Sequence, residues 1–377
     1  MVLFAVFLFG IIPFQFSIAQ AQEDSWTSLA PMPIPRRGLG IATVNDKIYA
    51  IGGLGNLTNN EEYNPETNTW TLKRPLAKAR TNFGITATQN KIYVIGGSSN
   101  LTEEYNPATD TWVTKASMPT PRNGLDANLV DGKIYLIGGT EADQSSSSKN
   151  EVYDIDTNSW ETKTPISFPV CQYASAVVGK KIHIIGGFAS VNGDNEYTLN
   201  QIYDTETDSW SLGTPLLVGV TDSSCGVTSG FFAPVRVYVM GGFGTGDDFG
   251  CVDFVQVYDP QKDTWSFGAN MPTARFNLAV AVVNDMLYAI GGTSRYLLPG
   301  EAHYAKSENE VYTPIGYGTP DPSHTPPPDP TPTPTLSPTP TPTPKPEQFP
   351  TTLIIASVAI IAIVGIGIFV YFKKRKT

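Results

Sequence analysis

Residues 91–113 read KIYVIGGSSNLTEEYNPATDTWV. An apolar run ends in a Gly-Gly pair, a loop leads to a tyrosine, and a tryptophan follows the tyrosine by seven residues. Five of the six tryptophans stand 26 residues before the first glycine of such a pair, and the sixth stands 31 residues before it. Fixed offsets at a period of 42 to 55 residues indicate one structural unit repeated six times. The tryptophans are Trp26, Trp70, Trp112, Trp160, Trp210 and Trp265, and the first glycines are Gly52, Gly96, Gly138, Gly186, Gly241 and Gly291.

The second unit has the pattern of four short strands. Residues 80–88 are apolar and β-branched, residues 91–95 form a second apolar run, and two shorter runs end at Asn106 and Val113. Turn residues separate the runs. A four-stranded sheet of this size cannot bury both faces alone, whereas six such sheets stacked radially can. We expect the tyrosine and tryptophan rings to pack between neighbouring sheets.

The order of two glycines, a loop, a tyrosine and a tryptophan resembles the kelch repeat, and the resemblance runs from about Trp26 to Tyr312. It implies an all-β fold, a six-bladed β-propeller. The last unit ends at Tyr312 without a following tryptophan, while the first begins with an orphan Trp26. We therefore expect the N-terminal segment to supply the outer strand of the sixth blade and to close the ring.

The composition predicts five segments. Residues 1–21 are apolar and end in Ala-Gln-Ala, which is typical of a cleaved signal peptide, with an uncleaved anchor as the alternative. Residues 22–316 form the propeller, and residues 317–350 form a Pro/Thr-rich stalk. Residues 351–372 form a transmembrane helix, and the basic residues 373–377 form a cytoplasmic tail. These features predict a single-pass cell-membrane protein with an extracellular propeller.

The formal net charge is −10, and the acidic balance of the head disfavours nucleic acid or anionic lipid as a partner. The C-terminal anchor resembles those of archaeal surface proteins, some of which are processed by transpeptidases. Asn56 and Asn100 each begin an Asn-Leu-Thr sequon, so both are candidate glycosylation sites.

Loop lengths predict where a ligand binds. From the first glycine to the tyrosine the six units count 11, 9, 15, 17, 17 and 21 residues, so units three to six carry longer loops on one face. Binding residues concentrate on such loops. Asp248 and Tyr296 lie in them. The alternative to ligand binding is that the longer loops are neutral insertions at the surface.

Four arginines are candidate ligand-binding residues because each lies 16 residues before a Gly-Gly pair, at the start of an innermost strand: Arg36, Arg80, Arg122 and Arg275. Intracellular kelch proteins that resemble this chain hold acidic peptides with arginines in this neighbourhood, through the bidentate guanidinium group. The alternative is structural pairing with the abundant acidic residues. Units four and five carry Val170 and Cys225 at this offset.

Three cysteines in an exported chain suggest one disulfide and one free thiol. Cys171 and Cys225 begin adjacent innermost strands, and Cys251 lies in a loop of the same unit as Cys225. Both Cys171–Cys225 and Cys225–Cys251 are plausible pairings, and we prefer Cys225–Cys251 because it pins a long loop. Three reduced thiols remain the alternative.

Catalysis has little support in the sequence. Secreted kelch-type oxidases hold copper with two histidines and two tyrosines, but this chain has three histidines, of which His183 lies within a strand and His324 in the stalk. We expect no cofactor and no metal. The predicted function is a non-catalytic binding or adhesion module for a protein or glycan at the loop face. The alternative is a carbohydrate-active kelch enzyme of the sialic-acid mutarotase type, which acidic and basic groups around the channel would serve.

Overall fold

The computed structural model describes residues 22–54, 58–97, 99–191, 194–245, 250–294 and 305–319. All regular elements within these ranges are strands, which confirms the all-β prediction. The segments predicted as signal peptide and transmembrane helix lie outside the described residues, as does the stalk beyond Thr319. Within the described ranges there is no helix with the length and apolar character that a bilayer crossing requires.

Six of the sheets have four antiparallel strands each, and their order from the centre outward follows the sequence in the first five. The first sheet contains β2 (Gly40–Val44), β3 (Lys47–Ile51), β4 (Asn60–Asn64) and β5 (Thr69–Lys73). The second contains β6 (Gly84–Ala87), β7 (Ile92–Ile95), β8 (Thr102–Asn106) and β9 (Thr111–Thr114). The third contains β10 (Ala127–Val130), β11 (Lys133–Ile137), β12 (Asn150–Asp154) and β13 (Ser159–Lys163).

The remaining three follow the same plan. The fourth contains β15 (Ala174–Val178), β16 (Lys181–Ile185), β19 (Asn200–Asp204) and β20 (Ser209–Leu212). The fifth contains β22 (Ser224–Val227), β23 (Val237–Met240), β26 (Val255–Asp259) and β27 (Thr264–Gly268). The sixth contains β28 (Ala279–Val283), β29 (Met286–Ile290), β30 (Asn309–Thr313) and β1 (Ser25–Ser28).

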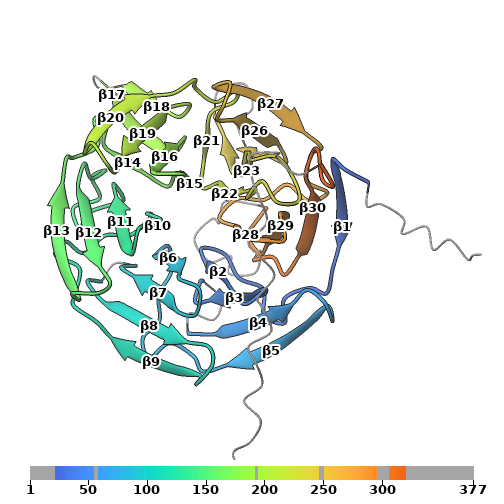
Figure 1. Cartoon of the computed structure of the whole chain (residues 1–377), viewed down its shortest axis with the longest axis horizontal. Coiled ribbons are helices and arrows are strands. Elements are labelled where there is room, and N and C mark those ends of the chain that lie inside the picture. Colours follow the sequence, from blue (N-terminus) through green and yellow to red (C-terminus); the bar gives the residue numbers. More distant parts are fainter. Residues whose placement is uncertain are drawn as a thin grey trace, which may run out of the picture. The chain divides into compact units, whose positions relative to one another are not determined.

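The sheets lie around a common centre, with β2, β6, β10, β15, β22 and β28 innermost (Figure 1). Each innermost strand contacts the next, and β28 contacts β2. Apolar side chains fill the space between adjacent sheets. The first and last sheets share such a core, in which Ile48 and Tyr63 pack with Ala281 and Tyr288.

The N-terminal strand completes the sixth sheet, as the orphan tryptophan predicted. β1 pairs with β30 in antiparallel register, so that Trp26 lies opposite Tyr312. Their ring centroids are 5.1 Å apart. The equivalent pair in the first sheet, Tyr63 and Trp70, has the same cross-strand register and a centroid distance of 4.9 Å.

The tryptophans join neighbouring sheets, which confirms the role predicted for them. All six indole N–H groups donate to a backbone carbonyl of the preceding unit. The Gly-Gly pairs lie at close backbone approaches: a Cβ atom on Gly96, whose φ is +80°, would meet the carbonyl oxygen of Arg122 at 2.8 Å. These spacings are therefore fixed by contacts between units.

The longer loops of units four and five fold as small sheets of their own. The first of these contains β14 (Val170–Cys171), β17 (Phe188–Val191) and β18 (Asp194–Glu196). The second contains β21 (Val220–Thr221), β24 (Phe243–Gly244) and β25 (Gly250–Cys251). In each, the segment that leads into an innermost strand pairs with a hairpin from the long loop.

The two ends of the described chain lie together at the turn end of the sixth sheet. Ser25 pairs with Thr313, and the N–H of Gly316 donates to the Glu23 carboxylate at 2.6 Å. Farther on, the N–H of Gly318 donates to Phe232 O at 2.7 Å. Phe232 belongs to a nine-residue connection, residues 228–236, between β22 and β23. This connection contains the extra length that made the tryptophan–glycine spacing of unit five 31 residues.

The connection is held by one buried carboxylate. Asp285, at the turn between β28 and β29, accepts backbone N–H bonds from Ser229, Phe232 and Ala233 at 2.5, 2.8 and 3.0 Å. β28 begins two residues after Asn277 and runs toward this turn. Asp285 and the chain ends therefore lie at the opposite end of the sheets from Asn277.

Candidate functional site

A closed cycle of backbone hydrogen bonds surrounds the centre of the head. It joins the residues that precede the six innermost strands: Gly38, Asn82, Gly124, Gln172, Asp222 and Asn277. The N–H of each residue donates to the carbonyl of its counterpart in the preceding unit at 2.8 to 2.9 Å. Gly38 of the first unit donates to Asn277 of the last, so the cycle has no open end.

All six residues have left-handed backbone conformations, with φ between 51° and 60°. Glycine, asparagine and aspartate adopt this conformation most readily, and they occupy five of the six positions. Gln172 adopts it at greater cost, and we attribute its conformation to the hydrogen bonds of the cycle. The cycle was not predicted, although four of these residues lie two positions after the predicted arginines, and Gln172 and Asp222 lie two positions after Val170 and Val220.

The cycle surrounds a cavity of about 190 Å³ lined by residues of all six units. The two halves of its wall differ in chemistry. Units one, two and six contribute mostly apolar side chains: Leu39, Ile41, Phe83, Ile85, Leu278 and Val280. Units three to five contribute most of the polar groups: Asp126, Asn128, Gln172, Ser175, Asp222, Ser223 and Ser224.

Asp126 is the centre of the polar half. Its carboxylate accepts hydrogen bonds from the N–H and the hydroxyl of Ser175 at 3.0 and 3.1 Å. The Ser175 hydroxyl also lies 2.8 Å from Asn128 Oδ1. Burial raises the pKa of Asp126 to about 6, and the bonds from Ser175 oppose that rise.

The four predicted arginines precede innermost strands and form buried ion pairs. Their partners are glutamates on the third strands, in the pairs Arg36–Glu61, Arg80–Glu103, Arg122–Glu151 and Arg275–Glu310. The arginine side chains are at most 1% exposed. Three of the pairs measure 2.6 to 2.8 Å between Nη2 and Oε2. This is the structural pairing that the sequence left as the alternative, and we place no ligand on these residues.

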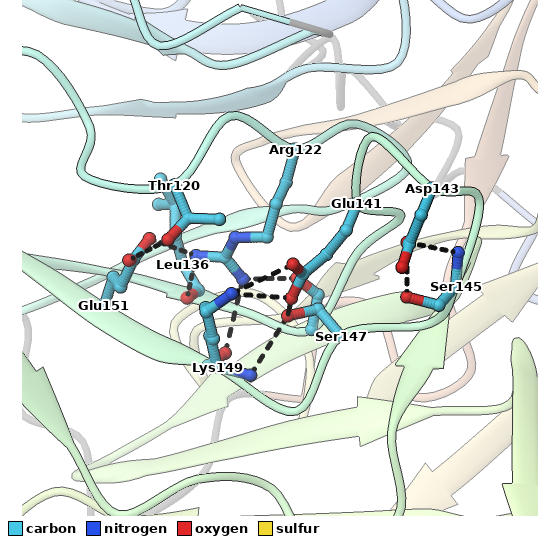
Figure 2. Close-up of polar contacts among 10 residues, drawn as sticks. Thr120, Arg122, Leu136, Glu141, Asp143, Ser145, Ser147, Lys149 and Glu151 are labelled. Carbon is cyan, nitrogen blue, oxygen red and sulfur yellow. Dashed lines mark hydrogen bonds and ion pairs between the residues drawn. The ribbon is translucent and has the colours of Figure 1, made fainter.

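Figure 2 shows one arginine in its setting. Arg122 donates to the carbonyls of Leu136 and Lys149 at 3.2 and 3.3 Å, and also to that of Gly138. Its partner Glu151 accepts a second bond, from the Thr120 hydroxyl, at 2.7 Å. The guanidinium therefore ties the segment before the innermost strand to the second and third strands of its unit.

Units four and five replace this pair with a neutral one. Val170 and Val220 occupy the arginine positions, and Gln201 and Gln256 occupy the glutamate positions. Each glutamine amide bonds both the N–H and the carbonyl of one residue, Phe168 or Val218, at 3.0 Å. Loss of the positive charge thus accompanies loss of the negative one, a coupling that the sequence displays and that we did not predict.

The assignment of Cys225 to the arginine position was wrong. The extra residues of unit five lie after β22, in residues 228–236. Counting 16 residues back from Gly241 therefore stops five residues short of the equivalent residue, which is Val220. The predicted Cys225–Cys251 disulfide is also not formed, since all three cysteines are free thiols. Cys225 Sγ faces the Ser175 carbonyl of unit four at 2.8 Å, whereas Cys251 Sγ faces the Thr293 carbonyl of unit six at 3.8 Å.

The long loop of unit three is internally bonded. Glu141 forms an ion pair with Lys149 at 2.8 Å and accepts a bond from the Ser147 hydroxyl at 2.7 Å, and Asp143 accepts bonds from Ser145 (Figure 2). We call the long loops of units three to five the raised sector of the loop face. This loop and the hairpins of units four and five make the raised sector a folded structure. Asp248, Tyr296 and Asn56 lie outside the described residues, and Asn100 is exposed.

His183 packs inside β16, as its strand position predicted. It is buried, its Nδ1 lies 3.1 Å from Asn200 Oδ1, and burial lowers its pKa. Among the described residues, no three His, Cys, Asp or Glu side chains come together in a group that can hold a metal ion.

Comparisons with known proteins agree with the repeat pattern. The Attractin/LZTR1 β-propeller family matches residues 92–313, more than half of the chain, and the kelch motif matches residues 35–76. Kelch-like protein 28 of Homo sapiens is 35% identical to the chain over 63 residues. That match covers 17% of this chain and 11% of the human protein, so the chain spans only a small part of that relative's length. The predicted resemblance to kelch propellers is confirmed.

Proposed function

The chain belongs to the Attractin/LZTR1 β-propeller family, and we propose that it is a non-catalytic binding module of the cell surface whose ligand, a protein or a glycan, docks on the loop face. Kelch propellers are typically protein-interaction modules. The single observation that carries the proposal is the folded, raised sector of loops beside the channel mouth, in units three to five. Rigid loops lose little conformational entropy on binding, so such a sector is suited to recognition.

We further propose that the six four-stranded sheets are the six blades of a closed propeller. The pairing of β1 with β30, the shared core of the first and last sheets and the cycle of hydrogen bonds from Gly38 to Asn277 support closure. A closed ring leaves no inner edge open, and it holds the loops of different blades at fixed separations.

The positions of the chain ends support the proposed presentation at a surface. Residues 22–25 and 313–319 lie at the turn end of the sheets, opposite the end at which the hydrogen-bond cycle surrounds the cavity. The proposed stalk, residues 317–350, and helix, residues 351–372, therefore continue from the end of the head that lies opposite the loop face. The signal-like residues 1–21, the basic tail and the resemblance to archaeal surface anchors support export and an extracellular head.

Asp248 and Tyr296 remain proposed ligand contacts, and Asn56 and Asn100 remain proposed glycosylation sites. Glycans at the two asparagines would cover the low sector of units one and two and leave the raised sector accessible. The mutarotase alternative gains no support from the channel, because the described residues that line the cavity include two carboxylates and no basic side chain.

The proposal is tested with the full-length protein in nanodiscs on protein and glycan arrays. Glu141→Ala with Lys149→Ala, which removes the ion pair of the unit-three loop, is expected to weaken binding of the partner found by at least tenfold. Lys133→Ala is the matched control, because its 2.9 Å pair with Asp154 lies at the opposite end of the same sheet. Equal binding by the loop variant and loss of binding by the control variant would exclude the loop face.

A further inference from the structure

The cavity at the head's centre contains polar groups that the ring itself does not use. Ser223 and Asn128 line it and are 8% and 4% exposed. Neither Ser223 Oγ nor Asn128 Nδ2 has a hydrogen-bond partner within the described protein. Buried polar atoms are nearly always paired, so the unpaired Ser223 hydroxyl on the cavity wall indicates an occupant that supplies its missing bond. The Asn128 Nδ2 group is a donor and needs an acceptor instead.

The polar half also carries an uncompensated negative charge. Asp126 forms hydrogen bonds with Ser175 and has no ion pair among the described residues. Among the described residues, the other titratable groups that line the cavity are Asp222, Tyr173 and Cys225, and none of them is cationic. Burial raises the pKa values of Tyr173 and Cys225, so both are neutral at physiological pH. A carboxylate in such a setting is stabilised by a cation.

The apolar half of the cavity lining, across from Asp126, does not suit a bare metal ion. Leu39, Ile41, Ile85, Leu278 and Val280 offer hydrocarbon surface across from Asp126's half of the lining. The cavity volume, about 190 Å³, exceeds the roughly 150 Å³ in which an apolar cavity holds a benzene-sized molecule. The lining therefore fits a molecule with a charged end and a short apolar body.

We propose that the channel cavity binds a small primary alkylammonium ion, with Asp126 as counter-ion, Ser223 as a hydrogen-bond acceptor and the Leu39–Ile85–Leu278 wall around the hydrocarbon. An ammonium group donates three hydrogen bonds, which suits a lining that includes both a carboxylate and a free hydroxyl oxygen. This site is separate from the raised loops and does not depend on the proposed function.

The test titrates the full-length protein in nanodiscs with n-butylammonium chloride by calorimetry at pH 7.5. We expect saturable binding at one site per chain, at least tenfold tighter than that of 1-butanol, and no binding of sodium butyrate. Asp126→Asn keeps the shape of the side chain but removes its charge, and is expected to weaken binding at least tenfold. Asp156→Asn, on an exposed turn of the same unit, is the control and leaves the affinity unchanged.

Two further measurements keep the test decisive if Asp126→Asn unfolds. Ser223→Ala removes a hydroxyl that has no partner to lose, and is expected to weaken binding several-fold in a folded protein. Lowering the pH from 7.5 to 5 is expected to weaken binding, because the pKa of Asp126 is raised to about 6 and its protonated form carries no charge. Equal affinity for butylammonium and butanol, full binding by Asp126→Asn, or no binding at millimolar concentration overturns the proposal and leaves the cavity to solvent.

Discussion

Arg275 Nη2 lies 2.6 Å from Glu310 Oε2, and the two side chains are 0% and 5% exposed. The pair joins the segment before β28 to β30 and accounts for an arginine that the sequence offered to a ligand. Burial lowers the pKa of Arg275, while the charge of Glu310 opposes that change.

Breaking this pair on one side is expected to destabilise the head more than replacing both partners. Arg275→Val or Glu310→Gln alone leaves one buried charge uncompensated, at a cost of about 3–5 kcal/mol. The double variant reproduces the neutral pairs of units four and five, Val170 with Gln201 and Val220 with Gln256, and is expected to recover most of that loss. Denaturant unfolding of the three variants measures this, and a double variant as unstable as the sum of the single ones contradicts it.

Trp26→Ala is expected to lower the free energy of unfolding by about 3–4 kcal/mol. The indole packs on Tyr312 and donates to Ala269 O at 2.9 Å, so it holds β1 to the fifth and sixth sheets. Trp112→Ala removes the equivalent contacts inside the continuous part of the chain and serves as the reference. If Trp26→Ala costs far less than Trp112→Ala, β1 does not contribute to stability as its pairing implies.

Asp285→Ala is expected to cost about 2–3 kcal/mol, because three backbone N–H groups lose a charged acceptor. It is also expected to expose residues 228–236 to proteolysis. Asp46→Ala is the matched control, since Asp46 occupies the same turn position in the first sheet but is exposed. Equal proteolysis and stability of the two variants would mean that the connection is held by other contacts.

Asp126 gives the head a defined pH dependence. Its pKa in the folded state is about 6, against about 3.9 in an unfolded chain, so the folded state binds the proton more tightly. Its contribution therefore favours folding at pH 4 and is lost as the pH rises through 6, by on the order of 2 kcal/mol. The difference in unfolding free energy between wild type and Asp126→Asn, measured from pH 4 to 7.5, reports this contribution. A difference that does not vary with pH is the contrary result.

Protease added to intact cells is expected to release a folded head by cutting between Thr319 and Pro350. The proposed stalk lacks the residues that build a core, whereas the described head is tied together up to Gly318. Immunoblotting of the medium detects the released head. Protection in intact cells with cleavage only after lysis reverses the proposed orientation.

The repeat and its strands could be predicted because their signals are local. Seven residues separate each tyrosine from its tryptophan across one β-turn, so the spacing of Tyr105 and Trp112 already predicts a hairpin. The site was less predictable, since the partners of the arginines lie 23 to 35 residues away and acidic residues are abundant. The position of the extra length in unit five was also invisible, because a spacing gives the number of added residues and not their place.

The sequence by itself determined the repeated unit, the strands and the need for Trp26 to complete the last sheet, because each depends on spacings that one unit imposes on its own chain. Only the tertiary structure decided that the arginines are buried, that Cys225 and Cys251 face different units, and that Asp126 lies on a cavity wall. The arginine pairs depend on contacts within one unit between residues 23 to 35 positions apart. The other two facts depend on which groups of different units meet. That meeting is set when the six sheets pack and the backbone cycle from Gly38 to Asn277 closes.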